Sequence, residues 1–335
     1  MNAPDEIHNW NDISDQGWSG ILLGNGASIA IWDNFGYASI FERARQGIEN
    51  PLSPQDIELF EQFQTRNFEV TLSSLTTSLR VNRALGLQDA EVLARYQSIR
   101  RALVQAVRSV HIPWVAFDED RRHLVRNALL DYDYVYSTNY DLLVYWAIMA
   151  RPRGEGFKDY FWTEEFNIGD TEITDKVTKV LYLHGGIHLY RTSSGTTLKR
   201  RANPNENLLD LFGVPYRGDA TPLFISEGDS EQKLASIYGS DYLSFAYSKF
   251  TAHEGPLVVF GHSLSEASDK HLVDVIDRWR SRDIAISVHN YNNERDFVRR
   301  VATLRRSFPS ARLQFFRADT HPLGNGLLRV APQQG

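Results

Sequence analysis

Residues 134–141 read YVYSTNYD, a short apolar and aromatic run that ends at once in a polar cluster. Other apolar runs along the chain end in the same way, in a glycine or a polar side chain. They are Gly20 to Leu23 before GNGAS, Val180 to Leu183 before HGG, Leu257 to Phe260 before GHS, Ile284 to Val288 before HNYNN, and Leu313 to Phe316 before RADTH. Unbroken runs of this length are typical of strands buried on both faces, as in a parallel sheet.

Helical stretches follow several of these runs, for instance from Glu266 to Arg280 and from Glu294 to Ser307. Strand, loop and helix in alternation predict an α/β fold with a Rossmann-like doubly wound parallel sheet of about six strands. We expect residues 1–52 and 113–335 to form this sheet domain.

A long helical section, residues 53–112, interrupts that domain. Ser53 and Pro54 have the pattern of an N-cap followed by a first helical residue, and Asp56 completes a capping box. Apolar residues between Val92 and Val110 recur at helical spacing. We expect this stripe to pack on the domain itself, and a lid or an oligomerisation element is the alternative. Residues 191–240 read as a loop or hairpin whose LKRR cluster forms a solvated turn.

The composition excludes several classes of function. The 335-residue chain has no cysteine, so disulfides, cysteine nucleophiles and cysteine-ligated zinc are ruled out. A formal net charge of −6 disfavours a dedicated nucleic-acid binder. The polar N-terminal stretch lacks the apolar core of a signal peptide, and no apolar run approaches the roughly 20 residues that span a bilayer. We expect a cytoplasmic protein without direct nucleic-acid or membrane binding.

The loop Gly24-Asn25-Gly26-Ala27-Ser28 follows the first strand and precedes a predicted helix. Free backbone amides and the helix dipole suit a diphosphate there, and glycines allow its close approach. An ordinary tight turn explains the same residues equally well. Because the loop lacks the third glycine of the dinucleotide fingerprint, and no acidic strand end follows, a hydride-transferring dehydrogenase is disfavoured.

Candidate chemistry follows the next two strands. Asn139 can bond ribose hydroxyls and Asp141 can receive a carboxamide N–H, although both residues can also cap the helix behind them. His184 can act as a general base near neutral pH, although a lone histidine is more often structural. The glycines after it argue against a helix that presents His184 and His188 to a metal, and we expect no metal ion.

Two later strand ends complete the set. Gly261 and Ser263 can let a nucleotide lie over one strand end, and Asn290 follows the next strand, although either segment can be a simple helix cap. A parallel sheet brings the carboxyl ends of its strands to one edge, where such sheets bind ligands.

In order and spacing these residues resemble the sirtuin pattern, from about residue 18 to residue 292. A sirtuin carries a GAG-x-S loop, a TQNID strand end, a catalytic histidine before glycine, a GTS loop, and an asparagine after a later strand. The matching positions are Gly24 to Ser28, Thr138 to Asp141, His184-Gly185, Gly261 to Ser263, and Asn290. The stretches Pro222 to Gly228 and Asp241 to Leu243 also look like an uncharacterised bacterial branch of sirtuin-like proteins.

The departures from the sirtuin pattern narrow the activity that it implies. The four-cysteine zinc module that shapes the peptide groove of sirtuin deacylases is missing. Residues 32–36 read WDNFG where a sirtuin has the PDFR segment. The arginine is therefore missing here, while Phe35 remains to cover the nicotinamide pocket. The resemblance therefore implies an NAD glycohydrolase, like bacterial sirtuin-like proteins of anti-phage defence that hydrolyse NAD to nicotinamide and ADP-ribose.

The resemblance also implies roles for the site residues. Asn139 would hold the nicotinamide ribose or the attacking water, and His184 would act as the base. The loop from Gly24 to Ser28 would bind the diphosphate, Asp141 the carboxamide, and Ser263 and Asn290 the adenosine half. Since an uncontrolled NAD hydrolase harms its host, we expect control by homo-oligomerisation or by a regulatory or sensor partner protein. The alternatives are a catalytically silent sensor subunit that binds NAD or ADP-ribose, and an NAD-dependent protein deacylase.

Overall fold

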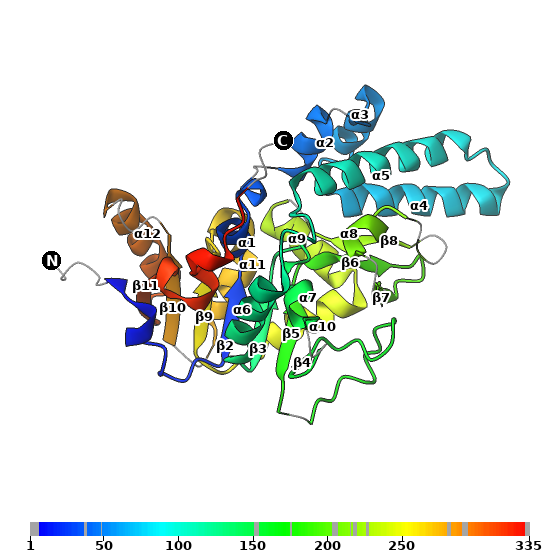
Figure 1. Ribbon diagram of the computed structural model, residues 1–335. Coiled ribbons are helices and arrows are strands. Elements are labelled where there is room, and N and C mark those ends of the chain that lie inside the picture. Colours follow the sequence, from blue (N-terminus) through cyan, green and yellow to red (C-terminus); the bar gives the residue numbers. More distant parts are fainter. Residues whose placement is uncertain are drawn as a thin grey trace.

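An all-parallel sheet of eight strands forms the centre of the computed structural model, in the order β1-β11-β10-β9-β2-β3-β5-β4 (Figure 1). The structure describes residues 7–36, 39–47, 49–150, 154–174, 176–202, 207–214, 216, 220–225, 228–279, 283–289 and 294–331. The strands of this sheet are β1 (Ile7–His8), β2 (Gly20–Leu23), β3 (Tyr134–Ser137), β4 (Phe157–Lys158), β5 (Thr178–Tyr182), β9 (Leu257–Phe260), β10 (Asp283–Val288) and β11 (Arg312–Arg317).

The sheet confirms the predicted fold class. Each of the six apolar runs forms a strand, and the central strands β2 and β9 are buried along their whole length. The two additional strands, β1 and β4, have two residues each and lie at the sheet edges. Edge strands this short carry no apolar run, so the sequence pattern does not reveal them.

Helices connect the strands and cover the sheet. Those of the sheet domain are α1 (Asn25–Ile31), α2 (Ile40–Gln46), α6 (Glu119–Leu130), α7 (Leu143–Ile148), α8 (Leu208–Leu211), α9 (Ser230–Tyr238), α10 (Asp241–Thr251), α11 (Glu266–Asp277) and α12 (Glu294–Ser307). The predicted helix from Glu294 to Ser307 is confirmed, and the one that begins at Glu266 ends at Asp277. No helix in the described ranges is long and apolar enough to cross a membrane.

A small antiparallel sheet follows β5 directly, in the order β7-β6-β8. Its strands are β6 (Gly185–Arg191), β7 (Thr197–Lys199) and β8 (Thr221–Phe224). β6 and β7 form the predicted hairpin, but the prediction that LKRR is a solvated turn is wrong, because Lys199 and Arg200 are buried. Lys199 Nζ lies 2.5 Å from Asp159 Oδ2, and Arg200 donates to the carbonyls of Leu211 and Val214. Each buried cation thus has the acceptors that burial requires.

The predicted helical insertion consists of α3 (Pro54–Gln62), α4 (Phe68–Leu85) and α5 (Ala90–Val110). The capping box is confirmed, since Ser53 and Asp56 each accept a hydrogen bond from the other's backbone N–H. The apolar stripe of α5 is buried from Ile99 to Val110 and belongs to the same hydrophobic core as the sheet. The stripe therefore packs on the domain itself, as expected. In Figure 1 the α4–α5 hairpin lies beside the antiparallel sheet.

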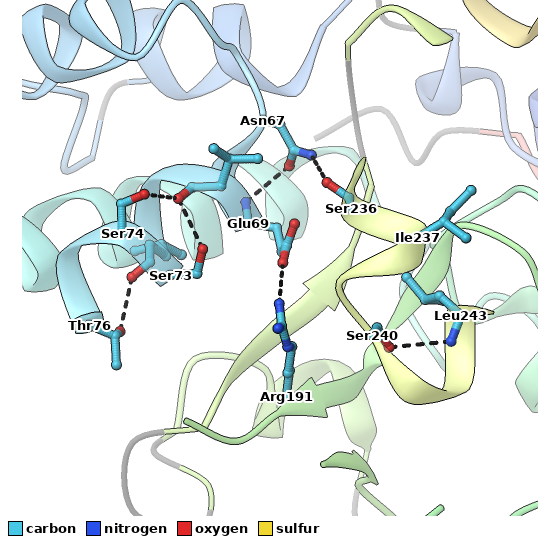
Figure 2. Close-up of polar contacts among 12 residues, drawn as sticks. Asn67, Glu69, Ser73, Ser74, Thr76, Arg191, Ser236, Ile237, Ser240 and Leu243 are labelled. Carbon is cyan, nitrogen blue, oxygen red and sulfur yellow. Dashed lines mark hydrogen bonds and ion pairs between the residues drawn. The ribbon is translucent and has the colours of Figure 1, made fainter. Parts of the chain in front are cut away.

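Polar contacts fasten this hairpin to the sheet domain (Figure 2). Glu69 on α4 is buried, and its Oε1 lies 3.5 Å from Nη1 of Arg191 on β6. Burial raises the pKa of the Glu69 carboxyl, while contacts with Ser236 and Arg191 oppose that shift. Asn67 at the start of α4 accepts from the Glu69 N–H and approaches Ser236 on α9 with Nδ2 at 3.5 Å. The hairpin is thus attached through α9 as well as through β6.

Removal of the cation at this junction is expected to destabilise the protein. Arg191→Leu leaves the Glu69 carboxylate buried without its counter-ion, so the free energy of unfolding should fall by about 1–3 kcal/mol. Glu69→Gln keeps the shape and leaves Arg191, which is partly exposed, able to find water, so it should cost less. Urea unfolding of both variants and of the double variant measures the coupling. Equal effects of the two single variants would contradict this account.

Candidate functional site

The predicted site lies where the central strands end in register. Leu23 at the end of β2 pairs with Ser137 of β3 and with Phe260 of β9, and Ser137 pairs with Tyr182 of β5. β3, β4 and β5 lie on one side of β2, whereas β9, β10 and β11, which come later in the chain, lie on its other side. Such a switch point is where open α/β sheets leave a crevice for ligands.

A cavity of about 390 Å³, here called the strand-end cavity, opens at this edge of the sheet. It is lined by Asn25, Gly26, Phe35, Ser39, Ile40, Thr138, Asn139, Tyr140, Asp141, His184, Ile225, Lys233, Gly261, His262, Ser263 and Asp269. Most of the predicted site residues therefore meet in one place. Gly24 and Ser28 contact Asn139 from behind the cavity wall, and Asn290 lies outside the described residues.

Hydrogen bonds fix the orientation of the Asn139 side chain. Its Nδ2 donates to the Gly24 carbonyl at 3.0 Å and to Ser28 Oγ at 2.9 Å. A carbonyl can only accept, so the amide must present its nitrogen to Gly24. Both N–H groups of Asn139 are thus engaged, and its Oδ1 is the group left to bind a ligand in the cavity.

Asp141 stands at the other end of the same network. Its Oδ2 accepts from Ser28 Oγ at 2.5 Å, and its Oδ1 accepts from the N–H of Leu143, the first residue of α7. Burial raises the pKa of this carboxyl, and the bonds from Ser28 and Leu143 oppose the shift. The N-cap of α7 is Leu142, so the expectation that Asn139 and Asp141 cap this helix is not confirmed: Asp141 bonds the first turn from the position before the cap, and Asn139 bonds Gly24 and Ser28 instead. The binding of a carboxamide by Asp141 stays a prediction.

The glycines of the loop from Gly24 to Ser28, here called the first loop, are needed for packing. The loop interlocks with the turn after β9, so that a Cβ on Gly24 would lie 2.5 Å from Cα of His262. On Gly261, whose φ is +69°, a Cβ would lie 2.2 Å from the nitrogen of Ala27. The N–H of Gly26 donates to the Gly261 carbonyl at 2.8 Å, and that of Ala27 donates to the Gly24 carbonyl. These two amides, which we expected to be free for a diphosphate, are already used within the protein.

His184 is buried and belongs to a chain of polar contacts that the sequence did not predict. Its Nε2 lies 3.0 Å from Nε2 of His271 on α11, and Nδ1 of His271 lies 3.0 Å from Ser230 Oγ on α9. Burial lowers the pKa of His184 well below its ordinary value and that of His271 to about 4, and Lys233 adds to both shifts. Both imidazoles are therefore neutral at physiological pH, and a neutral imidazole can accept a proton.

A buried ion pair borders these histidines. Lys233 Nζ on α9 lies 2.7 Å from Asp269 Oδ1, and Ser268 donates to Asp269 Oδ2. Burial alone would raise the pKa of Asp269, but His262 and Lys233 beside it outweigh that effect and hold the pKa at about 2. Residues two apart on a regular helix point in different directions. A kink at Asp269, where φ is −133° and ψ is 27°, lets both Asp269 and His271 reach the cluster.

His184, Asp269 and His271 could also hold a metal ion, because one ligand atom from each lies within 4.8 Å of the others. The two imidazoles are, however, arranged end to end. Their ring centroids are 5.3 Å apart and their Nε2 atoms 3.0 Å apart. The difference of about 2.3 Å is about twice the distance from a ring centre to its Nε2, so the two Nε2 atoms lie on the line between the rings and point at each other. An ion bound by both nitrogens would have to lie off that line. Lys233 already binds Asp269. This geometry favours a direct hydrogen bond between the histidines over shared ligation.

The fold and the cavity define the chain as an α/β protein with a Rossmann-like parallel sheet and a polar site at its carboxyl edge. The chain belongs to the family DUF4917, a domain of unknown function, whose pattern it matches over residues 21–323. No curated protein matches the sequence.

Proposed function

We propose that this protein hydrolyses the nicotinamide–ribose bond of NAD, with water as the co-substrate and nicotinamide, ADP-ribose and a proton as products. The observation that carries the proposal is the meeting of a fixed Asn139 and a neutral His184 in one cavity at the switch point of the sheet. The sirtuin-like order of the motifs supports NAD as the substrate.

Asn139 positions the reacting groups in this proposal. Because its N–H groups are held by Gly24 and Ser28, its Oδ1 offers a fixed acceptor to a ribose hydroxyl or to the attacking water. Cleavage of the glycosidic bond passes through a transition state with oxocarbenium character, which a correctly placed water must meet from the opposite face. Fixed placement of that kind lowers the barrier mainly through entropy.

His184 is the proposed base. In the tautomer that this role requires, Nε2–H of His184 donates to His271, Nδ1–H of His271 donates to Ser230, and Nδ1 of His184 carries the free lone pair. The histidine pair thus sets the orientation of the base, as a second residue does for the general base in many hydrolases. When Nδ1 takes a proton from water or a ribose hydroxyl, the ionised Asp269 nearby offsets part of the cost that burial and Lys233 impose on the imidazolium.

We further propose that the insertion controls the site, as part of an anti-phage defence response in which a homo-oligomer contact or a sensor partner is the trigger. Helix α9 connects the two parts. Its Ser236 approaches Asn67 of α4, while its Ser230 and Lys233 contact His271 and Asp269 at the site. A shift of the α4–α5 hairpin would therefore move residues that orient His184.

The experiment is to incubate the purified chain with NAD and to quantify nicotinamide and the adenosine products by chromatography. We expect nicotinamide and ADP-ribose in equal amounts, and at most a small fraction of them from an identically purified Asn139→Ala protein, which controls for contaminating hydrolases. A chelator should leave the rate unchanged, because the proposed mechanism has no metal. Loss of activity on chelation would instead assign a metal to His184, Asp269 and His271.

Other outcomes distinguish the alternative functions. Binding of NAD without turnover, also in the presence of the native partner, would favour a silent sensor of NAD or ADP-ribose. Nicotinamide release only with an acylated peptide would favour a deacylase. Absence of NAD binding would contradict the proposal.

A further inference from the structure

A second cavity adjoins the strand-end cavity. Its volume is about 530 Å³, and the two share Gly26, Gly261, His262 and Ser263 as lining residues. The second cavity is lined in addition by Ile29, Ala30, Asp33, His289, Arg300 and Arg329, and is here called the Arg300 cavity. The turn after β9 thus separates two connected compartments, one with the candidate catalytic groups and one with cations.

Arg300, on α12, is a cation without an acidic partner among the described residues. Within the part of the chain that the structure describes, the guanidinium makes one hydrogen bond, from Nη2 to the His262 carbonyl at 3.1 Å, and its buried Nε has no hydrogen-bond partner. Burial lowers the pKa of this guanidinium from its usual value, a sign of incomplete compensation. Arg329, in contrast, forms an ion pair with Asp33 at 2.7 Å. The unbalanced charge of the cavity is therefore that of Arg300.

A half-buried guanidinium that lacks a carboxylate is costly unless a ligand supplies an anion. A planar fork of N–H donors suits phosphate oxygens in particular. The first loop cannot supply all the donors that a dinucleotide phosphate needs, since the amides of Gly26 and Ala27 are already bonded to Gly261 and Gly24. Hydrogen-bond donors for a phosphate are therefore lacking in the first loop, on the side of the candidate catalytic residues. Such a donor, Arg300, is present in the neighbouring cavity.

We propose that the Arg300 cavity is the phosphate site of a dinucleotide ligand, and that Arg300 is the residue that binds the phosphoryl group. This deepens the proposed function, on which it rests for the identity of the ligand as a dinucleotide. The phosphoryl group belongs either to the central diphosphate or to an additional phosphate on the adenosine ribose, as in NADP. The lining residues shared by the two cavities place such a group across the turn after β9 from Asn139 and His184.

Calorimetric titration with ADP-ribose tests the proposal without any need for turnover. If Arg300 binds the central diphosphate, Arg300→Gln raises the Kd of ADP-ribose about 10- to 100-fold, the effect of losing a charged hydrogen bond; if Arg300 binds the ribose phosphate, the same loss appears with NADP instead. Arg299→Gln, the exposed neighbour on the same helix, is the matched control and should leave the Kd unchanged. Adenosine, which has no phosphate, should bind the wild type and Arg300→Gln equally. Arg300→Lys keeps the charge without the fork, and should lie between the wild type and Arg300→Gln.

Titrations with NAD and NADP distinguish the two sources of the phosphate. Equal losses for NAD, NADP and ADP-ribose in Arg300→Gln assign the diphosphate, whereas a loss largely confined to NADP assigns the ribose phosphate. If Arg300→Gln folds and binds all three ligands like the wild type, the proposal is wrong. It is equally wrong if the wild type binds none of them. A wild type that stays inactive also in the presence of its native partner, but binds ADP-ribose through Arg300, would overturn the hydrolase proposal alone. An active Arg300→Gln with unchanged affinities would overturn only the phosphate site.

Discussion

Asn139→Ala is expected to lower the rate of NAD hydrolysis by roughly 10²- to 10⁴-fold, because it removes the fixed acceptor that orients the reacting groups. The substitution also leaves the Gly24 carbonyl and Ser28 Oγ without the donor that Asn139 supplies. A buried group deprived of its partner costs about 1–3 kcal/mol, so the variant should remain folded but unfold at a lower temperature. Initial rates under saturating NAD, with circular dichroism of both proteins, give the two effects separately.

A companion variant makes the test specific. Asn139→Asp preserves the size of the side chain but brings a carboxylate oxygen to the Gly24 carbonyl, where the wild type has a donor at 3.0 Å. Repulsion between the two oxygens should turn the side chain away, so this variant should be as inactive as the alanine variant. Asn127→Ala, at an exposed position of α6, is the control and should keep full activity. Activity in Asn139→Asp close to the wild type would show that Asn139 does not act through this network.

The sequence predicts the sheet well because each of its longer strands is an unbroken apolar run. β2 and β9 show this most clearly, since their predicted and observed limits coincide. The polar residues directly after the strands are predictable for a related reason, because parallel strands in register bring them to one edge. Asn139, His184 and Gly261 thus meet although they lie far apart in the chain.

The rest of the candidate site was not predictable, because it depends on tertiary structure. Ser230 and Lys233 lie in the first turns of α9, at and just after a capping box of Asp229 and Gln232 that any surface helix could have. Asp269 and His271 reach His184 only through the kink in α11, and their spacing on a straight helix would have separated them. The prediction that Lys199 and Arg200 are solvated fails for a similar reason. A basic cluster in the sequence does not show which hydrogen-bond acceptors the fold brings to it, here Asp159 and the Leu211 carbonyl.

Acidification from pH 7 to pH 5 is expected to destabilise the protein strongly, because several of its histidines are buried in the neutral form. Burial lowers the pKa of His111 and His271 to about 4, and that of His188 and His321 to about 3. In the unfolded chain each returns to about 6.5. The unfolded state therefore binds more protons at every pH between these values. The stability that the protein gains from keeping these histidines neutral is fully present above about pH 6.5. It is lost as the pH falls from there toward 4.

For one such histidine, the free energy of unfolding falls by about 2 kcal/mol between pH 7 and pH 5. This is close to the largest change that a group with an unfolded pKa of about 6.5 can cause over this range. A few of these residues together would remove much of the roughly 5–15 kcal/mol that stabilises a typical domain. Urea unfolding at pH 7, 6 and 5 measures the effect. A free energy of unfolding that is constant over this range would contradict the neutral burial of these residues.

His188 offers the sharpest variant for this test. Its ring is completely buried between Tyr145 and Tyr182, and neither ring nitrogen has a hydrogen-bond partner within the described part of the chain. His188→Phe therefore removes a titrating group without breaking a hydrogen bond, and any packing strain that it introduces is the same at each pH. The variant should lose about 2 kcal/mol less than the wild type between pH 7 and pH 5. If the two proteins lose equal stability, His188 does not contribute to the acid sensitivity, and the effect must come from histidines such as His271 that contact other polar groups.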